Sequence, residues 1–322
     1  LSIVIPVLSS TFASVGRFLK HAGNMSLGML IIDESGQAVP QSALGAIYRT
    51  RRAVVVGDPL QVEPVVTIPK VLIDILADST CVANEYKVIE NSAQTFADNI
   101  NEFNGMIGER QVGCPLVVHR RCIEPMFSIS NLISYDNRMF NKTNKKEEYL
   151  KPENPFLIKK SGWINVEGVE NGGKDHFVKN QAERVCQLME DAVHIYSDLF
   201  ETDDRIFIIT PFRTVAESMR KFIISYFSAK GYDKEILSKW TKNCVGTVHT
   251  FQGKDANEVL LVLGCSNKSA GAMNWVVKKA NILNVACTRA KYRIAFIGNI
   301  NDWKNRRYFR EFIPNLIDII NV

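Results

Sequence analysis

Two adjacent carboxylates follow a short apolar run near the start of the chain. Asp33 and Glu34 come directly after Met-Leu-Ile-Ile at residues 29–32. An apolar run this short, without alternation, predicts a strand buried on both faces of a parallel sheet. Open α/β sheets bind ligands at the carboxyl ends of their strands, so Asp33 is placed to hold a hydrated Mg²⁺ and Glu34 to polarise an attacking water, as in nucleotide hydrolases. Taken alone, the pattern fits equally well a strand that ends in a solvated acidic turn.

A second apolar run, at residues 53–56, also ends in residues that could do chemistry. It is followed by Gly-Asp-Pro-Leu-Gln, which contains Asp58 and Gln61. Two neighbouring strands that end in this way would bring these side chains and the Asp33-Glu34 pair to one edge of the sheet. The neutral amide of Gln61 can donate to a γ-phosphate and accept from a water without adding negative charge. Gly-Asp-Pro also forms a turn on its own account, and the two interpretations are compatible.

The segments that must position these residues alternate between strand and helix patterns. Short apolar runs predict buried strands at residues 163–166, 206–209, 259–263 and 294–297. Apolar positions at helical spacing predict helices at residues 181–199, 215–227 and, in the tail, 303–320. Pro40 near the start and Arg49 at the end predict a further helix at residues 40–49. This alternation predicts an α/β fold with doubly wound parallel sheets.

The chain opens on a strand-like stretch, residues 2–8, that leads into small hydroxyl residues around one aromatic. Thr11 in this turn could donate to a nucleic-acid phosphate, or it could simply cap a helix. Because the first residue is Leu1 and not Met, we expect the chain to be a piece of a longer polypeptide.

Composition excludes several classes of protein. The 322 residues are 46% hydrophobic and 23% charged, which is ordinary for two domain-sized soluble cores. No apolar run approaches membrane-spanning length, so no membrane association is expected. The seven cysteines are scattered without a Cys-x-x-Cys pair. This indicates neither a zinc site nor a disulfide framework, and it favours the reducing cytoplasm, or the nucleus of a eukaryote.

The net charge of +5 is unevenly distributed along the chain. Residues 1–112 carry 8 Lys and Arg against 11 Asp and Glu, whereas residues 113–322 carry 31 against 23. A basic second part suits a polyanionic partner such as nucleic acid. Lysine-rich loops that only keep the protein in solution would give the same balance.

Six blocks of sequence, in order and covering nearly the whole chain, resemble the motifs of superfamily 1 helicases. The resemblance is to the 1B-like group that includes the helicase of nonsense-mediated mRNA decay. The blocks are DESGQA at residues 33–38 and GDPLQVEP at 57–64 (motifs II and III), PLVVHRRC at 115–122 with 127–140 (motif IV), IFIITPF at 206–212, VGTVHTFQGKD at 245–255 (motif V) and NVACTRAK at 284–291 (motif VI). The resemblance implies RecA-like domains of the P-loop NTPase helicase fold. Residues 1–112 would be the C-terminal part of an incomplete first domain, and residues 113–322 a complete second domain.

The resemblance also implies residue roles. The catalytic set would be Asp33 as Mg²⁺ ligand, Glu34, Gln61, Arg120 and Arg289. The two arginines would be fingers supplied by the second domain, because a guanidinium grips phosphate and stays ionised. Arg121 is a rival for Arg120, which we favour because it aligns with the Arg of the family's Q-Y-R-M-H.

Further residues would contact the nucleotide and the nucleic acid. The nucleotide contacts implied are Gln37, Asp58, Gly253 and Asp255. Asp255 stands where the family usually has Glu and is one methylene shorter. The nucleic-acid contacts implied are Thr11, Thr210, Pro211, His249 and Thr250.

Residues 168–175 match most of the sequence pattern of a phosphate-binding loop but lack its Mg²⁺-binding hydroxyl. They fit G-x-x-x-x-G-K, but Asp175 stands where the loop needs Ser or Thr for Mg²⁺. No helix pattern begins at once behind it, so we predict a surface turn. The true Walker A loop is then expected upstream of Leu1, and the isolated chain is expected to bind and turn over nucleotide poorly.

Together these features predict an ATP-dependent helicase or translocase motor that uses ATP and Mg²⁺ and moves on single-stranded DNA or RNA. We expect a monomer. The alternative, from a different class, is a non-catalytic nucleic-acid-binding or scaffolding module of helicase fold.

Overall fold

The computed structural model describes residues 6–83, 86–89, 91–108, 110–143, 156–170, 172 and 175–320. The chain divides into two compact units, Leu1–Pro115 (unit 1) and Leu116–Val322 (unit 2). The assignment of these units to two RecA-like domains stays a prediction.

Unit 1 is built around two short parallel strands, β1 (Leu30–Ile32) and β2 (Ala53–Val55). Helix α2 (Pro40–Tyr48) connects them and begins with a proline, whose missing N–H would be unpaired at a helix start in any case. Helix α4 (Ala93–Ile100) packs with α2 and β1 in a small apolar core. The remaining elements of unit 1 are α1 (Phe12–Phe18), α3 (Lys70–Ser79) and the antiparallel pair β3 (Gly105–Ile107) and β4 (Arg110–Val112).

The prediction that the first apolar run is buried on both faces is wrong. Ile32 lies in the core, but Ile31 is 67% exposed, and its neighbour Val54 is also exposed. Successive side chains of a strand point to opposite faces, and the helices of the described part of unit 1 cover one face only. The strand predicted at residues 2–8 is not seen either: residues 1–5 lie outside the described residues, and residues 6–8 form no regular structure.

Unit 2 contains a six-stranded sheet in which all paired strands are parallel. Its order is β12 (Asp318–Ile320), β7 (Gly162–Asn165), β11 (Ala290–Gly298), β10 (Ala256–Val262), β8 (Ile206–Thr210) and β9 (Val245–Thr247). The central strands β8 and β10 are buried along almost their whole length. This sheet confirms the predicted α/β class, with the strands where the continuous apolar runs indicated them.

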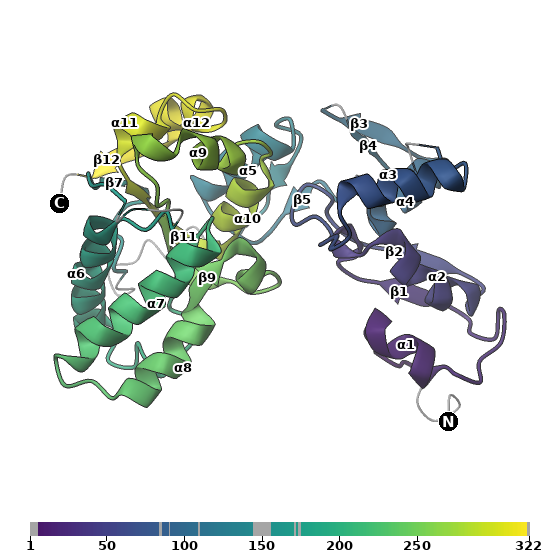
Figure 1. Ribbon diagram of the computed structural model, residues 1–322, viewed down its shortest axis with the longest axis horizontal. Helices are drawn as coiled ribbons and strands as arrows, with labels where there is room; N and C mark the ends of the chain where they lie inside the picture. Colours follow the sequence, from purple (N-terminus) through teal and green to yellow (C-terminus); the bar gives the residue numbers. More distant parts are fainter. Residues whose placement is uncertain are drawn as a thin grey trace. The chain divides into compact units, whose positions relative to one another are not determined.

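The helices of unit 2 form two groups (Figure 1). One group contains α6 (Lys179–Ile195), α7 (Arg213–Ser228) and α8 (Lys234–Cys244). The other contains α5 (Met126–Ser134), α9 (Ala270–Val276), α10 (Asn281–Arg289), α11 (Ile300–Trp303) and α12 (Phe309–Leu316). None of the helices that the structure describes combines the length and the apolar character needed to cross a membrane.

The tail differs from the predicted helix. After α12 the chain forms the edge strand β12, which pairs with β7 so that Asp318 lies opposite Gly162. A Cβ at Gly162 would lie 2.6 Å from the Asp318 carbonyl oxygen, so only glycine permits this close approach. The aromatic ring of Trp163 stacks on Phe296 and meets Phe309 edge to face, which anchors the tail on the sheet.

The predicted surface turn at residues 168–175 is only partly a surface feature. The side chain of Glu170 is buried, and its backbone bridges Val178. Residues 171, 173 and 174 lie outside the described residues, as do residues 144–155 of the predicted surface loop at 141–160. Burial of Glu170 follows from partners almost a hundred residues away, which local sequence does not reveal.

Candidate functional site

The two polar turns of unit 1 pack backbone against backbone. A Cβ on Gly36 would lie 2.7 Å from the Asp58 carbonyl oxygen, and one on Gly57 would lie 2.6 Å from the Gly36 nitrogen. Ser35 joins the turns further, because its backbone N–H and its hydroxyl both donate to the Val56 carbonyl oxygen, at 3.0 and 2.9 Å. Glycine at both positions therefore allows the contact, and the structure brings the two strand ends together as their spacing predicts.

The carboxylates of the first turn, Asp33 and Glu34, are exposed, and hydrogen bonds fix their orientation. The backbone N–H of Glu34 donates to Asp33 Oδ1 at 2.9 Å, and Gln37 Nε2 donates to Glu34 Oε2 at 2.9 Å. Glu34 has a left-handed backbone with φ +53°, which is uncommon for a residue other than glycine. Such strain persists where surrounding structure imposes it, and it is frequent at functional sites.

In the second turn, Asp58 holds Gln61 in place. Asp58 Oδ2 accepts from Gln61 Nε2 at 2.9 Å, and its Oδ1 accepts from the Leu60 backbone N–H at 2.9 Å. Both Asp58 and Gln61 are half-buried. The geometry therefore gives Asp58 the task of orienting Gln61, in addition to the nucleotide contact that the sequence predicted.

In unit 2, Arg120 and Arg121 project from a turn after β5 (Val118–His119), which pairs with β6 (Phe140–Asn141). The turn closes on His119, whose Nε2 accepts from the Cys122 backbone N–H at 2.9 Å. Burial, followed by the charge of Arg121, lowers the pKa of His119 below its usual range. Arg120 and Arg121 are both exposed, so the structure does not distinguish between them as the predicted arginine finger.

The structure buries Arg289. Only 1% of this residue is exposed, and its Nη1 donates to the carbonyl oxygens of Phe251 and Lys254 at 3.3 and 3.0 Å. These carbonyls flank the turn that contains Gly253, which has φ +73°. Arg289 therefore holds the backbone of the motif V turn by hydrogen bonds. Its predicted role as an arginine finger stays a prediction.

Asp255 is paired with another motif residue. Its Oδ1 lies 2.7 Å from Lys291 Nζ, and both side chains are partly exposed. This ion pair joins motif V to motif VI within unit 2.

The second half of the predicted nucleic-acid set converges on a groove of about 490 Å³ in unit 2. The turn after β9, the turn after β8, the first turns of α7 and one side chain of α9 line it. The lining residues are Pro211, Phe212, Arg213, Ala216, Glu217, Arg220, Thr247, His249, Thr250 and Trp275. Thr210, also a predicted contact, does not line the groove: it is 1% exposed, and its hydroxyl accepts from the Phe212 backbone N–H at 3.4 Å.

Sequence reasoning missed the aromatic wall of this groove. Trp275 is 52% exposed, and its ring centroid lies 5.8 Å from that of Phe212. The available signal was a large aromatic residue three positions before the basic pair Lys278-Lys279, in the short helix α9.

Thr11, predicted to contact nucleic acid from unit 1, is exposed at the start of α1. Its hydroxyl donates to Ser14 Oγ at 3.2 Å and makes no capping bond to a backbone N–H.

Two family models match this chain. A family model described as an AAA domain matches residues 102–301, and a second model with the same description matches residues 5–68. The chain belongs to this AAA domain family. The AAA domain matches and the curated relatives confirm the resemblance to superfamily 1 helicases.

Curated relatives of this AAA domain chain carry helicase names. The probable helicase senataxin of Mus musculus is 24% identical over 320 residues, which cover 96% of this chain and 11% of the relative. An uncharacterized ATP-dependent helicase of Methanocaldococcus jannaschii is 24% identical over 299 residues, or 88% of this chain and 38% of the relative. Regulator of nonsense transcripts 1 of Caenorhabditis elegans is 26% identical over 317 residues, or 91% and 26%. The chain therefore spans well under half the length of these relatives.

A solved structure of an arterivirus helicase, nonstructural protein 10, in complex with DNA is also similar. It is 13% identical, with a TM-score of 0.38, over 86% of this chain and 40% of that chain.

Proposed function

We propose that the chain is part of the motor core of an ATP-dependent helicase or translocase that moves on single-stranded nucleic acid. The observation that carries this proposal is the packing of the two turns at the carboxyl ends of β1 and β2. It presents the exposed carboxylates of Asp33 and Glu34 next to an amide, Gln61, that is already held in place.

The residues of unit 1 fit a Mg²⁺-nucleotide. Asp33 offers a carboxylate oxygen, the donor type that Mg²⁺ prefers, and Mg²⁺ when bound neutralises charge on the phosphate oxygens. Glu34 would accept a proton from the attacking water, and Gln61 would orient that water, supported by Asp58. Gln37 keeps the Glu34 carboxylate in position through its 2.9 Å hydrogen bond.

Unit 2 would supply positive charge to the nucleotide and hold the strand. Exposed Arg120 is the candidate for charge at the γ-phosphate, while Arg289 would fix the turn around Gly253. His249, Thr250 and Pro211 line the groove together with Arg213 and Trp275, which suits a phosphate backbone with stacked bases.

The segment that contains Trp275 of this groove has an excess of basic residues. Between residues 259 and 301 there is no Asp or Glu, whereas six basic residues occur: Lys268, Lys278, Lys279, Arg289, Lys291 and Arg293. A segment of one charge sign next to an aromatic wall favours single-stranded nucleic acid, bound largely without sequence preference.

The catalytic part of the proposal is tested by ATP hydrolysis of the complete gene product with Glu34→Gln as the variant. The change keeps the shape and removes the base, so kcat should fall by about 100-fold or more. Glu63→Gln, an exposed glutamate of the neighbouring turn, is the matched control and should leave kcat unchanged. Undiminished hydrolysis by Glu34→Gln would refute the assignment.

The second candidate function is a non-catalytic nucleic-acid-binding or scaffolding module. It is favoured by one observation, namely that all the residues lining the groove belong to unit 2, so that the groove is formed without any residue of unit 1. A complete gene product that binds single strands but hydrolyses no ATP would support this function and exclude the motor.

A further inference from the structure

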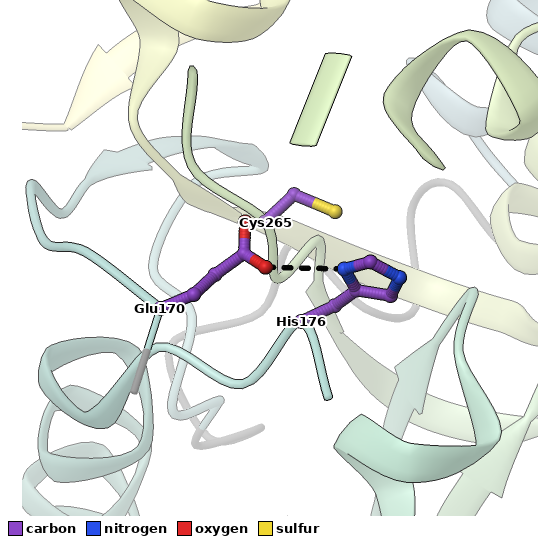
Figure 2. Close-up of side chains that lie close together, drawn as sticks. All are labelled: Glu170, His176 and Cys265. Atoms are coloured by element: carbon purple, nitrogen blue, oxygen red, sulfur yellow. Dashed lines mark hydrogen bonds and ion pairs between the residues drawn. The ribbon is translucent and has the colours of Figure 1, made fainter. Parts of the chain in front are cut away.

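Three side chains with different metal-binding chemistry meet in unit 2, and none of them is among the residues that line the groove. Glu170 and His176 come from the segment between β7 and α6, and Cys265 comes from the turn after β10 (Figure 2). One ligand atom from each residue lies within 4.8 Å of the other two. Cys265 is 2% exposed, and the carboxylate of Glu170 is buried, while the imidazole keeps some access to solvent.

We propose that Glu170, His176 and Cys265 form a binding site for a single Zn²⁺ ion. Sulfur, imidazole nitrogen and carboxylate oxygen are the donor types of protein zinc sites, and the presence of sulfur disfavours Mg²⁺ and Ca²⁺. Three protein ligands leave the fourth tetrahedral position to a water molecule. The charges of one thiolate and one carboxylate balance those of the ion.

Two serines donate hydrogen bonds to the Glu170 carboxylate, as outer-sphere residues do to the ligands of a metal ion. Glu170 Oε1 accepts from the Ser266 backbone N–H at 2.7 Å, and Oε2 accepts from Ser269 Oγ at 2.8 Å. Oε2 also lies 3.1 Å from His176 Nδ1. An ion would replace the proton shared by these two atoms, and the serine donors would continue to fix the carboxylate.

The backbone at two of the ligands is strained. His176 and Cys265 have φ +58° and +59°, a left-handed conformation that non-glycine residues rarely adopt. The two residues hold each other, since the Cys265 backbone N–H donates to the His176 carbonyl oxygen at 2.9 Å. Strained conformations that the surroundings impose gather at binding sites, and here they aim two different ligands at one carboxylate.

Hydrogen bonds hold Glu170 and His176 in place without metal, whereas packing alone holds the Cys265 thiol in the part of the chain that the structure describes. Among the described residues, no hydrogen-bond partner is found for Cys265 Sγ, although the residue is buried. Burial, together with the charge of Glu170, raises the pKa of the Cys265 thiol to about 12. Zn²⁺ binding would release that proton to solvent, as it does at other thiolate sites.

An ion here would join two segments far apart in sequence and lie close to the groove. The ring of His176 packs on Phe212, at 4.8 Å between centroids, and Phe212 lines the groove. Zinc would therefore fix the turn after β10 against the entry to α6, one side chain away from the proposed strand-binding surface.

The test uses Co²⁺ as a spectroscopic probe for Zn²⁺ on the purified 322-residue chain. We expect one equivalent of Co²⁺ to give a thiolate charge-transfer band and tetrahedral visible bands, and Zn²⁺ to displace it. Cys265→Ser should abolish the charge-transfer band, and His176→Ala should weaken Co²⁺ binding by at least about 100-fold. Ser269→Ala, which removes only an outer donor, should weaken it by roughly 10-fold.

Cys186→Ser is the matched control, because Cys186 is a fully buried thiol on α6. It should leave the Co²⁺ spectrum unchanged. Absence of a thiolate band in the folded wild-type chain would overturn the proposal even if a variant failed to fold, and so would a band that survives in Cys265→Ser. Neither result bears on ATP hydrolysis, so failure of the zinc site and failure of the proposed motor function are distinguishable.

Discussion

The aromatic wall of the groove gives the sharpest prediction about nucleic-acid binding. Trp275 is 52% exposed and leans on Phe212, so about half of its surface is available to a base. Stacking of one base on an aromatic side chain contributes about 1–3 kcal/mol. For a half-exposed ring we take the lower part of this range, about 1–2 kcal/mol, which is roughly a 5- to 30-fold change in Kd.

The perturbation is Trp275→Ala, measured by fluorescence anisotropy of a labelled single-stranded oligonucleotide. We expect Kd to rise by roughly 5- to 30-fold, whereas Trp275→Phe, which keeps a stacking face, should stay within about 3-fold of wild type. Intrinsic fluorescence gives a second readout, because the other three tryptophans, Trp163, Trp240 and Trp303, are buried. Quenching by the oligonucleotide should therefore disappear with Trp275.

Salt dependence separates stacking from charge. Arg213→Ala removes a cation from the groove and should make the slope of log Kd against log salt shallower by about 1. Trp275→Ala should leave that slope unchanged, since it removes no phosphate contact. An unaltered Kd in a folded Trp275→Ala variant would refute the assignment of this groove to a nucleic-acid strand.

Three further predictions concern the stability of the parts that carry the site. Gly57→Ala would drive a methyl group against Gly36 and should lower the free energy of unfolding of unit 1 by about 1–3 kcal/mol in denaturant titrations; a smaller loss would show that the turns separate easily. Glu258→Ala should cost unit 2 at least about 2 kcal/mol in the same measurement, because the buried carboxylate accepts from two backbone N–H groups, and a neutral result would mean that water replaces it. Burial lowers the pKa of His119 in the folded chain. The unfolded chain therefore binds more protons than the folded chain does below about pH 6.5, and acid favours unfolding. The melting temperature of unit 2 should fall as the pH drops from about 7.5 to 5.5. His119→Gln should reduce that fall, and an equal fall in both proteins would assign it to other groups.

The strands and the motif turns were predictable because their signals are local. A continuous apolar run such as residues 206–209 predicts a buried parallel strand whatever lies elsewhere in the chain. The contact between the DESGQ and GDPLQ turns was also predictable, since the ends of adjacent parallel strands meet at one edge. The glycines at 36 and 57 then allow the backbones to approach closely.

Burial of polar residues was not predictable, because it depends on partners distant in sequence. Arg289 looks like an exposed finger, yet its partners are carbonyl oxygens 35 and 38 residues away. Glu170 belongs to a glycine-rich segment that predicts a surface turn, but Ser266 and Ser269 hold it inside. For the same reason the cysteine spacing does not reveal that Cys265 lies beside His176, because the two residues meet only in the fold.

Some apolar residues that the sequence predicts to be buried are exposed. Ile31 reads as core because its neighbours are apolar, but whether a face is covered depends on packing partners that the run does not encode. Trp275 is likewise exposed and lines the groove.

The central claim is that ATP hydrolysis and single-strand binding are coupled, and one measurement tests it most directly. The rate of ATP hydrolysis by the complete gene product is measured against the concentration of a single-stranded oligonucleotide, for the wild type and for Trp275→Ala. We predict that the rate rises to a plateau, and that Trp275→Ala shifts the half-saturating concentration upward by roughly 5- to 30-fold with little change in the plateau. A hydrolysis rate that does not respond to nucleic acid would contradict the account.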